Sequence, residues 1–237
     1  MFLYGASGHG KVVLEIAPDI IKQISFFSEH DFGTHTFSHF YCLEDGQNIL
    51  QFKSDLEAAI LAAKKFGINT YSLIFPRNQC NVNYLSVCKD LGITCYRGVE
   101  KSFMYTPKSS NFQEYIKKIL RFLDSYFNIS GYNSYSFGSI SHDFPMNLPS
   151  SRFLRSFTLF DYLFIYFKKR RIINEMTYAA KNNLVFHLWW HPENFGKYKK
   201  YNFRLLSDIL THYIYLNGKY HFTSHNMSSF AKLLHET

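Results

Sequence analysis

The chain lacks the features that mark several special classes of protein. Its four cysteines form no CxxC pair, so reduced thiols in a cytoplasm are the simplest interpretation. The first residues lack a basic region, and glycines interrupt any apolar run there, so we expect no secretory signal. The most apolar run, over 157–167, contains Asp161 and is too short to span a bilayer. We therefore expect a cytoplasmic protein without a transmembrane segment.

Acidic residues are also scarce, with 18 against 26 basic ones and a formal net charge of +8. This balance would suit an anionic glycan, a nucleic acid or an anionic membrane surface. No long basic stripe with interleaved aromatics is present, so we expect no nucleic-acid partner. The one dense basic run, Lys-Lys-Arg-Arg over 168–171, predicts the solvated end of a helix.

What is present indicates one globular domain. The 237 residues are 46% hydrophobic and 19% charged, which is typical of a folded chain with a full core. Aromatic residues make up 19% of the chain. Some of them would suit a sugar cleft by stacking on pyranose faces, but general use in the core explains most of them.

Helical and strand-like patterns alternate along the chain. Strands are predicted over 2–4, 71–75, 93–96 and 184–188, helices over 11–22, 52–66, 84–91, 111–127, 157–181, 202–216 and 228–234, and a long loop over 128–151. Such βα units predict a largely parallel sheet in a barrel-like or open α/β fold. In these folds sites lie at the carboxyl ends of strands. His35, Arg77, Arg97 and His191 each follow or end a predicted strand, so we expect one shared pocket.

Histidine spacing gives the first candidate chemistry. Chance predicts about half of one pair at spacing four for 11 histidines. The chain has three such pairs, at 35/39, 187/191 and 221/225. On a helical turn, His35 and His39 would share a face and reach one divalent ion. Such a metal favours hydrolytic chemistry, since it makes hydroxide available at neutral pH. Two ligands do not complete a site, and solvent-facing histidines are the alternative.

The surrounding residues resemble those of a known family. The run Gly33-Thr34-His35-Thr36-Phe37-Ser38-His39 resembles the H-[ST]-x-x-H motif of the polysaccharide deacetylases, the NodB-homology carbohydrate esterases. Three further blocks are similar to one bacterial branch of this family, in the same order: residues 72–79 (SLIFPRNQ), 95–98 (CYRG) and 186–196 (FHLWWHPENFG). The resemblance covers most of the chain, from about residue 19 onward, and implies an irregular (β/α) barrel, incomplete at its N-terminal end.

The resemblance implies a set of roles. His35 and His39 would be ligands of a divalent metal, zinc by expectation, and His191 the general acid toward the leaving amine, which suits an imidazole. Arg77 would organise a catalytic carboxylate, although the residue order around it departs from the usual pattern. The alternative for His35 and His39 is a hydrogen-bonded pair with a structural role. The alternative for His191 is a histidine packed in a turn.

Two further residues are candidate substrate contacts. Arg97 would hold a carboxylate or touch the substrate, and a structural ion pair is its alternative, as it is for Arg77. Trp190 would stack on a sugar. Because successive strand residues face opposite ways, only one of Trp189 and Trp190 should face the pocket, and a core role is open for either. His187, within the predicted strand, is assigned to the core.

The family's first motif, an Asp pair that supplies a metal ligand and the general base, is missing. The acidic residues before His35 are Glu15, Asp19, Glu29 and Asp31, and none has a comparable context. Residues 1–18 instead resemble the start of sialic-acid-type sugar O-acyltransferases, a strand–turn–helix whose glycines (Gly5, Gly8, Gly10) approach a nucleotide-sugar phosphate. No hexapeptide repeats follow. We therefore divide the chain into an acyltransferase-like start, 1–18, and a deacetylase-like domain, 19–237.

Three functions follow. The first is metal-dependent hydrolysis of N-acetyl or O-acetyl groups on a glycan, a hydrolase activity that the missing Asp motif would impair. The second is a non-catalytic carbohydrate-binding remnant of the same fold. The third is nucleotide-sugar binding through the N-terminal glycines. The identity of the glycan and the oligomeric state stay open.

Overall fold

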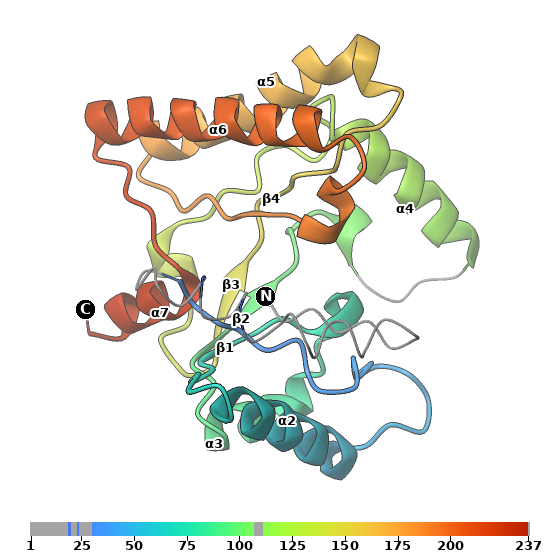
Figure 1. Ribbon diagram of the computed structural model, residues 1–237, viewed down its shortest axis with the longest axis vertical. Coiled ribbons are helices and arrows are strands. Elements are labelled where there is room, and N and C mark those ends of the chain that lie inside the picture. Colours follow the sequence, from blue (N-terminus) through green and yellow to red (C-terminus); the bar gives the residue numbers. More distant parts are fainter. Residues whose placement is uncertain (1–18, 20–22, 24–29, 107–110, 237) are drawn as a thin grey trace. The chain divides into compact units, whose positions relative to one another are not determined.

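The chain folds into two compact units in this computed structural model, which describes residues 19, 23, 30–106 and 111–236. Unit 1 comprises Met1–Gly98, Ser141–Leu148 and His225–Thr237, and unit 2 comprises Val99–Ile140 and Pro149–Ser224 (Figure 1). The predicted acyltransferase-like start, residues 1–18, lies outside the described residues. Its strand, its glycines and the boundary at 18/19 therefore stay predictions.

Unit 1 is built on a three-stranded sheet in the order β1 (Ser72–Leu73), β2 (Cys95–Gly98) and β3 (Met146–Pro149). β1 and β2 are parallel, and a parallel bridge from Thr34 to Leu73 extends the sheet beyond β1. The prediction of a loop over 128–151 is wrong at β3. This strand forms because Met146 donates its N–H to Thr94 at 2.8 Å, a pairing that local composition does not reveal.

Three helices accompany this sheet: α2 (Ile49–Lys64), α3 (Leu85–Asp90) and α7 (Met227–His235). α2 begins three residues before the predicted start at 52 because Asn48 and Gln51 form a reciprocal capping box. Phe52 and Leu56 of α2 pack with Leu73 and Phe75 in the core of unit 1. The hydrophobic periodicity therefore predicts the buried face of α2 correctly.

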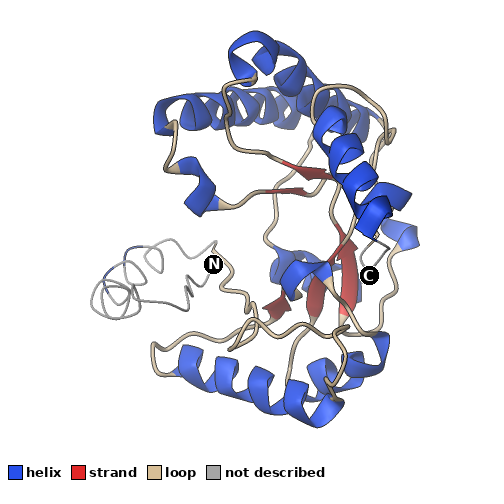
Figure 2. Cartoon of the chain, turned by 90° about the vertical axis from the view of Figure 1, so that its right-hand side faces the viewer, coloured by secondary structure: helices blue, strands red, loops and turns tan. Residues whose placement is uncertain are grey.

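Unit 2 is mainly helical, with α4 (Asn111–Asp124), α5 (Asp161–Lys181) and α6 (Lys199–Tyr220). α5 and α6 lie side by side along the unit (Figures 1 and 2). Two short strands, β4 (Arg152–Phe153) and β5 (Leu188–Trp189), pair in parallel. Both units also contain 3₁₀ turns, over Pro76–Asn78, Val82–Tyr84, Phe103–Tyr105, Phe137–Ser139 and Pro192–Phe195.

The coarse fold class, α/β with parallel strands, is confirmed. In the ranges that the structure describes, the strands form a three-stranded sheet and a separate two-stranded pair, and no closed barrel is formed. The finer prediction of an irregular barrel is part of the proposal below.

The basic run over 168–171 differs from its prediction. It lies in the middle of α5, and two of its four residues, Lys168 and Arg171, are buried. Lys168 pairs with Asp161 at 2.8 Å, and Arg171 pairs with Glu175 at 3.1 Å. The interpretation as a solvated helix end is therefore wrong for these two residues, because buried acids of the same helix neutralise them.

Two glycines of the quoted blocks lie where other chain segments approach closely. A Cβ on Gly33 would meet Ser72 Oγ at 2.6 Å, and one on Gly98 would overlap the side chain of Asn147 on β3. A larger residue at either position would therefore force the side chain of Ser72 or of Asn147 to move.

None of the four cysteines is in a disulfide, and burial raises the pKa of each thiol. The pKa values rise to about 12 for Cys42, Cys88 and Cys95 and to about 11 for Cys80. We expect labelling by a thiol reagent at pH 8 to be at least about 100-fold slower in the folded protein than in denaturant, because the thiolate is the reactive form. Equal labelling rates in the two states would contradict this burial.

Candidate functional site

The two predicted metal ligands lie at the carboxyl edge of the sheet of unit 1. Thr34 is held against β1 by hydrogen bonds to Ser72 O and from Ile74 N, at 2.8 and 2.9 Å, and His35 follows directly. His35 Nδ1 lies 2.7 Å from the carbonyl oxygen of Ile74. Because a carbonyl oxygen only accepts, Nδ1 donates this hydrogen bond, and the lone pair of the ring is on Nε2. A metal-binding histidine is oriented in this way.

The rings of His35 and His39 lie together, with centroids 4.7 Å apart and an edge-to-face angle of 71°. The prediction of a helical turn here is wrong, because the segment is an irregular loop. Positive φ values at Thr36 (61°) and His39 (60°) turn the chain instead. The pairing of the two imidazoles is thus confirmed, but through backbone turns rather than helical periodicity.

A strained backbone of this kind needs support from its surroundings. Residues in the left-handed region cost about 1–3 kcal/mol each and persist where the structure holds them, often at functional sites. Here Asp55 of α2 accepts the N–H groups of Phe37 and Ser38, both at 2.9 Å. Thr36 Oγ1 also accepts the N–H of Phe40 at 2.8 Å. The loop between the two histidines is therefore fixed from both sides.

Arg77 reaches this loop from the turn that follows β1. Its guanidinium lies over the ring of Tyr41, 4.2 Å from the centroid, and 3.9 Å from the Glu44 carboxylate. The Tyr41 hydroxyl lies 3.1 Å from His39 Nδ1. Partial burial and the charge of Arg77 both lower the pKa of His39 below its ordinary value. At neutral pH the ring of His39 is therefore neutral, the form that binds a metal.

Arg97 approaches from β2 and joins the same turn. It is buried, and its Nη2 donates to Asn78 Oδ1 at 3.0 Å. Arg77 and Asn78 have positive φ values of 50° and 55°. Of the seven described residues other than glycine with positive φ, four (Thr36, His39, Arg77 and Asn78) thus belong to this one region. Such clustering of strain is typical of a functional site rather than of a simple turn.

The remaining predicted residues belong to unit 2. His191 follows β5, is exposed, and pairs with Glu193 at 3.1 Å. Its ring lies against Trp189 and Phe153, with centroids 5.4 and 5.6 Å away. Trp190 packs instead against the core of unit 2 and stacks with Phe195 at 6.3 Å. The two tryptophans thus have different surroundings, as expected, but Trp189 is the one beside His191. The predicted roles of His191, Trp190 and Arg97 toward a substrate stay predictions.

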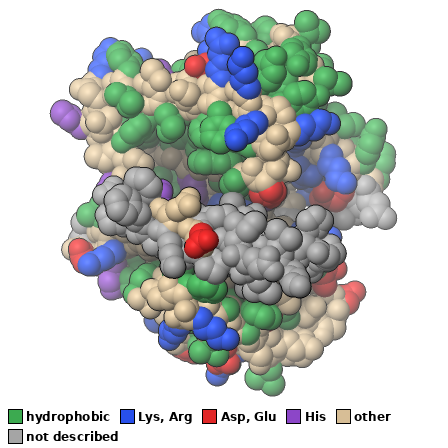
Figure 3. Space-filling view, in the orientation of Figure 1, with side chains coloured by type: hydrophobic (Ala, Val, Ile, Leu, Met, Phe, Trp, Pro, Cys, Tyr) green, Lys and Arg blue, Asp and Glu red, His purple; other side chains and the backbone are tan. Residues whose placement is uncertain are grey.

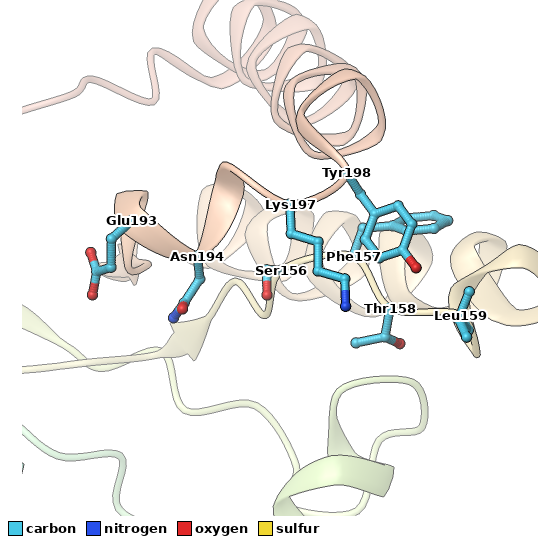
Figure 4. A pocket seen from close by; sticks show the side chains of 8 residues that line it. All are labelled: Ser156, Phe157, Thr158, Leu159, Glu193, Asn194, Lys197 and Tyr198. Atoms are coloured by element: carbon cyan, nitrogen blue, oxygen red, sulfur yellow. The ribbon is translucent and has the colours of Figure 1, made fainter.

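A cavity of about 340 Å³ lies in unit 2 (Figure 4). It is lined by Ser156, Phe157, Thr158, Leu159, Glu193, Asn194, Lys197 and Tyr198. The buried Asn202 holds two of its walls, since it accepts from Phe157 N at 2.6 Å and donates to Lys197 O at 2.9 Å. Hydroxyl, amide and ammonium groups beside aromatic rings are the side chains that a sugar-binding surface uses.

The site also contains residues that the sequence did not single out. Asp55 fixes the histidine loop, although its contacts are 17 and 18 residues away and no local pattern reveals them. Tyr41 follows the histidine run by two residues, so its position in the sequence was a signal that it lies near His39. Within the described ranges, no group of three or more His, Cys, Asp and Glu side chains is placed to hold a metal. A third protein ligand is therefore not found there.

Comparison with known proteins adds no relative: no protein-family model matches the chain, and neither do curated proteins or solved structures. Across the described part of the chain, we find no helix with the length and apolar content that crossing a membrane requires.

The Asp55 contacts predict a measurable effect on metal binding. For a zinc ion held by His35 and His39, as proposed below, we expect Asp55→Ala to weaken binding by about 10–100-fold, because Asp55 fixes the loop that carries both rings. Isothermal titration of the purified variant measures the affinity. Glu57→Ala is the matched control on α2, since Glu57 pairs with the exposed Lys53 at 4.0 Å. Equal affinity in the Asp55→Ala variant and wild type would contradict this positioning role.

Proposed function

We propose that the chain is a metal-dependent carbohydrate deacetylase whose divalent metal is held by His35 and His39. The observation that supports this proposal most is the paired imidazoles, 4.7 Å apart, with Nδ1 of His35 donating to a backbone carbonyl. Two imidazoles that bind one zinc ion at about 2.0–2.1 Å in tetrahedral geometry have centroids about 5 Å apart. The neutral His39 and the oriented His35 therefore fit a zinc ion or a similar cation.

A metal bound by His35 and His39 would supply Lewis-acid chemistry for the hydrolysis of an amide or ester. The residues around it would hold the substrate and keep the loops of the site in position. Arg77, stacked on Tyr41 and largely exposed, is placed to hold a carboxylate or a sugar oxygen. Arg97 acts as a positioning residue, since it fixes Asn78 in the same turn. The proposal includes the irregular (β/α) barrel of this family, which the parallel strands of both sheets support.

The acetylated sugar is the second part of the proposal. Acetate release from N-acetylated chito-oligosaccharides, measured with added zinc or cobalt, tests it directly. We expect release that a chelator abolishes and that re-added metal restores. An O-acetylated oligosaccharide, assayed in parallel, separates amide from ester hydrolysis. No acetate from either substrate, with metal bound, would contradict deacetylase activity.

A non-catalytic carbohydrate-binding role is the second candidate. It is favoured by the missing Asp pair and by the lack of a third ligand among the described residues. On this account the protein binds N-acetylated oligosaccharides with micromolar or weaker affinity and releases no acetate. Calorimetric titration with these sugars beside the acetate assay distinguishes the two functions.

A further inference from the structure

Helix α4 turns its polar side toward the body of unit 2. Lys117, which is buried, donates to the carbonyl of Thr106 at 3.0 Å, and Arg121 donates to the carbonyl of Met104 at 2.7 Å. Asp124, at the end of the helix, is fully buried. Amphipathic helices of folded proteins usually bury their apolar side, so α4 has the opposite orientation.

The apolar side of α4 is exposed. Phe112, Tyr115, Ile116 and Ile119 follow the i, i+3, i+4, i+7 spacing of one helical stripe. Phe112 is 73% exposed and Tyr115 is 65% exposed. A regular stripe of this kind is what a helix presents to another surface, so this side of α4 is suited to a partner.

The exposed stripe continues onto the start of α5. Phe122 of α4 contacts Phe160 at 5.4 Å between centroids, and Phe160 stacks on Phe164 at 4.2 Å. Leu163, one turn further on, is 80% exposed. We call the combined surface the aromatic face; it consists of Phe112, Tyr115, Ile116, Ile119, Phe160, Leu163, Tyr166 and Phe167. Apolar side chains gather in the upper right of Figure 3, where α4 and the start of α5 lie.

The fully exposed charges of α4 and α5 near this face are positive. The acids of α4 and α5 are buried (Asp124, Asp161 and Glu175) or, for Glu114, ion-paired with Arg121 at 3.3 Å. The cations are outside: Lys118 is exposed three residues from Tyr115, and Arg170 is exposed and donates to the Tyr166 hydroxyl at 2.7 Å. Aromatic and aliphatic side chains with a rim of Lys and Arg are the composition of surfaces that bind membranes peripherally.

We propose that the aromatic face docks on an anionic lipid surface. A negative bilayer complements Lys118 and Arg170, and its interfacial region accepts Phe, Tyr and Leu side chains. A second copy of the chain is the less suitable occupant, because a symmetric contact would bring cations toward cations, and Glu114, the one partly exposed acid of the two helices, already pairs with Arg121. The net charge of +8 also favours binding to an anionic surface. This inference is independent of the proposed deacetylase activity.

Vesicle flotation with the full chain tests the proposal. We expect binding to vesicles made from a roughly 2:1 mixture of phosphatidylcholine and phosphatidylglycerol, and at least about tenfold weaker binding to phosphatidylcholine alone. The double variant Phe112→Ser/Leu163→Ser should lose at least about tenfold in partitioning, since both side chains are largely exposed and neither supports the core. The matched control is Val82→Ser/Ile214→Ser, at two exposed apolar positions outside this face, and it should bind like wild type.

A charge-reversal variant tests the electrostatic part of the proposal. Lys118→Glu/Arg170→Glu should remove the preference for phosphatidylglycerol while the circular dichroism spectrum stays unchanged. Three outcomes overturn the proposal: no binding to the anionic vesicles, equal binding by the Phe112→Ser/Leu163→Ser variant, or a dimer in analytical ultracentrifugation that this variant dissociates. The last result would assign the face to a second copy of the chain.

Discussion

Arg152→Met will destabilise unit 2 by about 3–5 kcal/mol, because it leaves buried carboxylates without their main counter-charge. Arg152 is 2% exposed and bridges two fully buried acids. It donates to Glu175 at 2.7 and 3.0 Å and to Asp124 from the other side. Arg171 contacts the same two acids, so two guanidinium groups neutralise two carboxylates. Removal of one cation therefore leaves one buried negative charge in the cluster without a counter-charge.

Urea unfolding followed by tryptophan fluorescence measures this change, since Trp189 and Trp190 both belong to unit 2. Lys53→Met is the control, because it removes a cation from an exposed pair, with Glu57 at 4.0 Å, and should cost below about 1 kcal/mol. If Arg152→Met lowers the free energy of unfolding no more than this control does, the buried cluster contributes little to stability.

The same cluster predicts how stability depends on pH. Burial alone would raise the pKa of Asp124, but Arg152, the Ser130 N–H and Arg171 outweigh it and hold this pKa below its ordinary value. A carboxyl with a lowered folded-state pKa stabilises the fold above its unfolded pKa of about 4, and this contribution is lost as the pH falls through the folded pKa. In Arg152→Met the carboxyls lack their partner and bind protons more readily. The stability gap between wild type and variant should therefore narrow from pH 7 toward pH 4, and a constant gap would contradict this origin.

On the proposed deacetylase function, His35→Ala will lower acetate release by at least about 100-fold, since loss of an orienting group alone already costs about 10–100-fold in metal sites. His35 carries the better-defined ligand geometry, because its Nδ1 is committed to Ile74 O at 2.7 Å. His142→Ala is the matched control, as His142 is an exposed loop residue of the same unit. Initial rates at saturating zinc measure the effect. A His35→Ala enzyme with at least half of the wild-type rate would exclude His35 from the chemistry.

The sequence predicts the parts of this structure that local patterns encode. The α2 helix, with Phe52 and Leu56 on its buried face, follows from periodicity, and the positions of Arg77 and Arg97 near strand ends follow from βα alternation. β3 was not predictable in this way, because Met146–Pro149 has only four residues, ends in proline and is a strand only through its pairing beside β2. The pattern gives element types, whereas pairing partners depend on the tertiary fold.

The candidate site and the buried charges also combine features that local patterns encode with features that depend on the tertiary fold. The histidine pair is visible in the sequence, but its geometry depends on positive φ values and on Asp55, which no local signal marks. Arg171 belongs to a basic run that a sequence pattern assigns to solvent. Its partner Asp124 is 47 residues away, so only the folded structure shows that the charge is buried and paired.

Metal content tests the central claim most directly. We would purify wild type, His35→Ala and His142→Ala, incubate each with zinc, dialyse, and measure bound metal by inductively coupled plasma mass spectrometry. The account predicts about one zinc ion per chain in wild type and His142→Ala and less than about one tenth in His35→Ala, since both imidazoles are needed to hold the ion. Wild type without bound zinc, or His35→Ala with as much zinc as wild type, would contradict a metal site at His35 and His39.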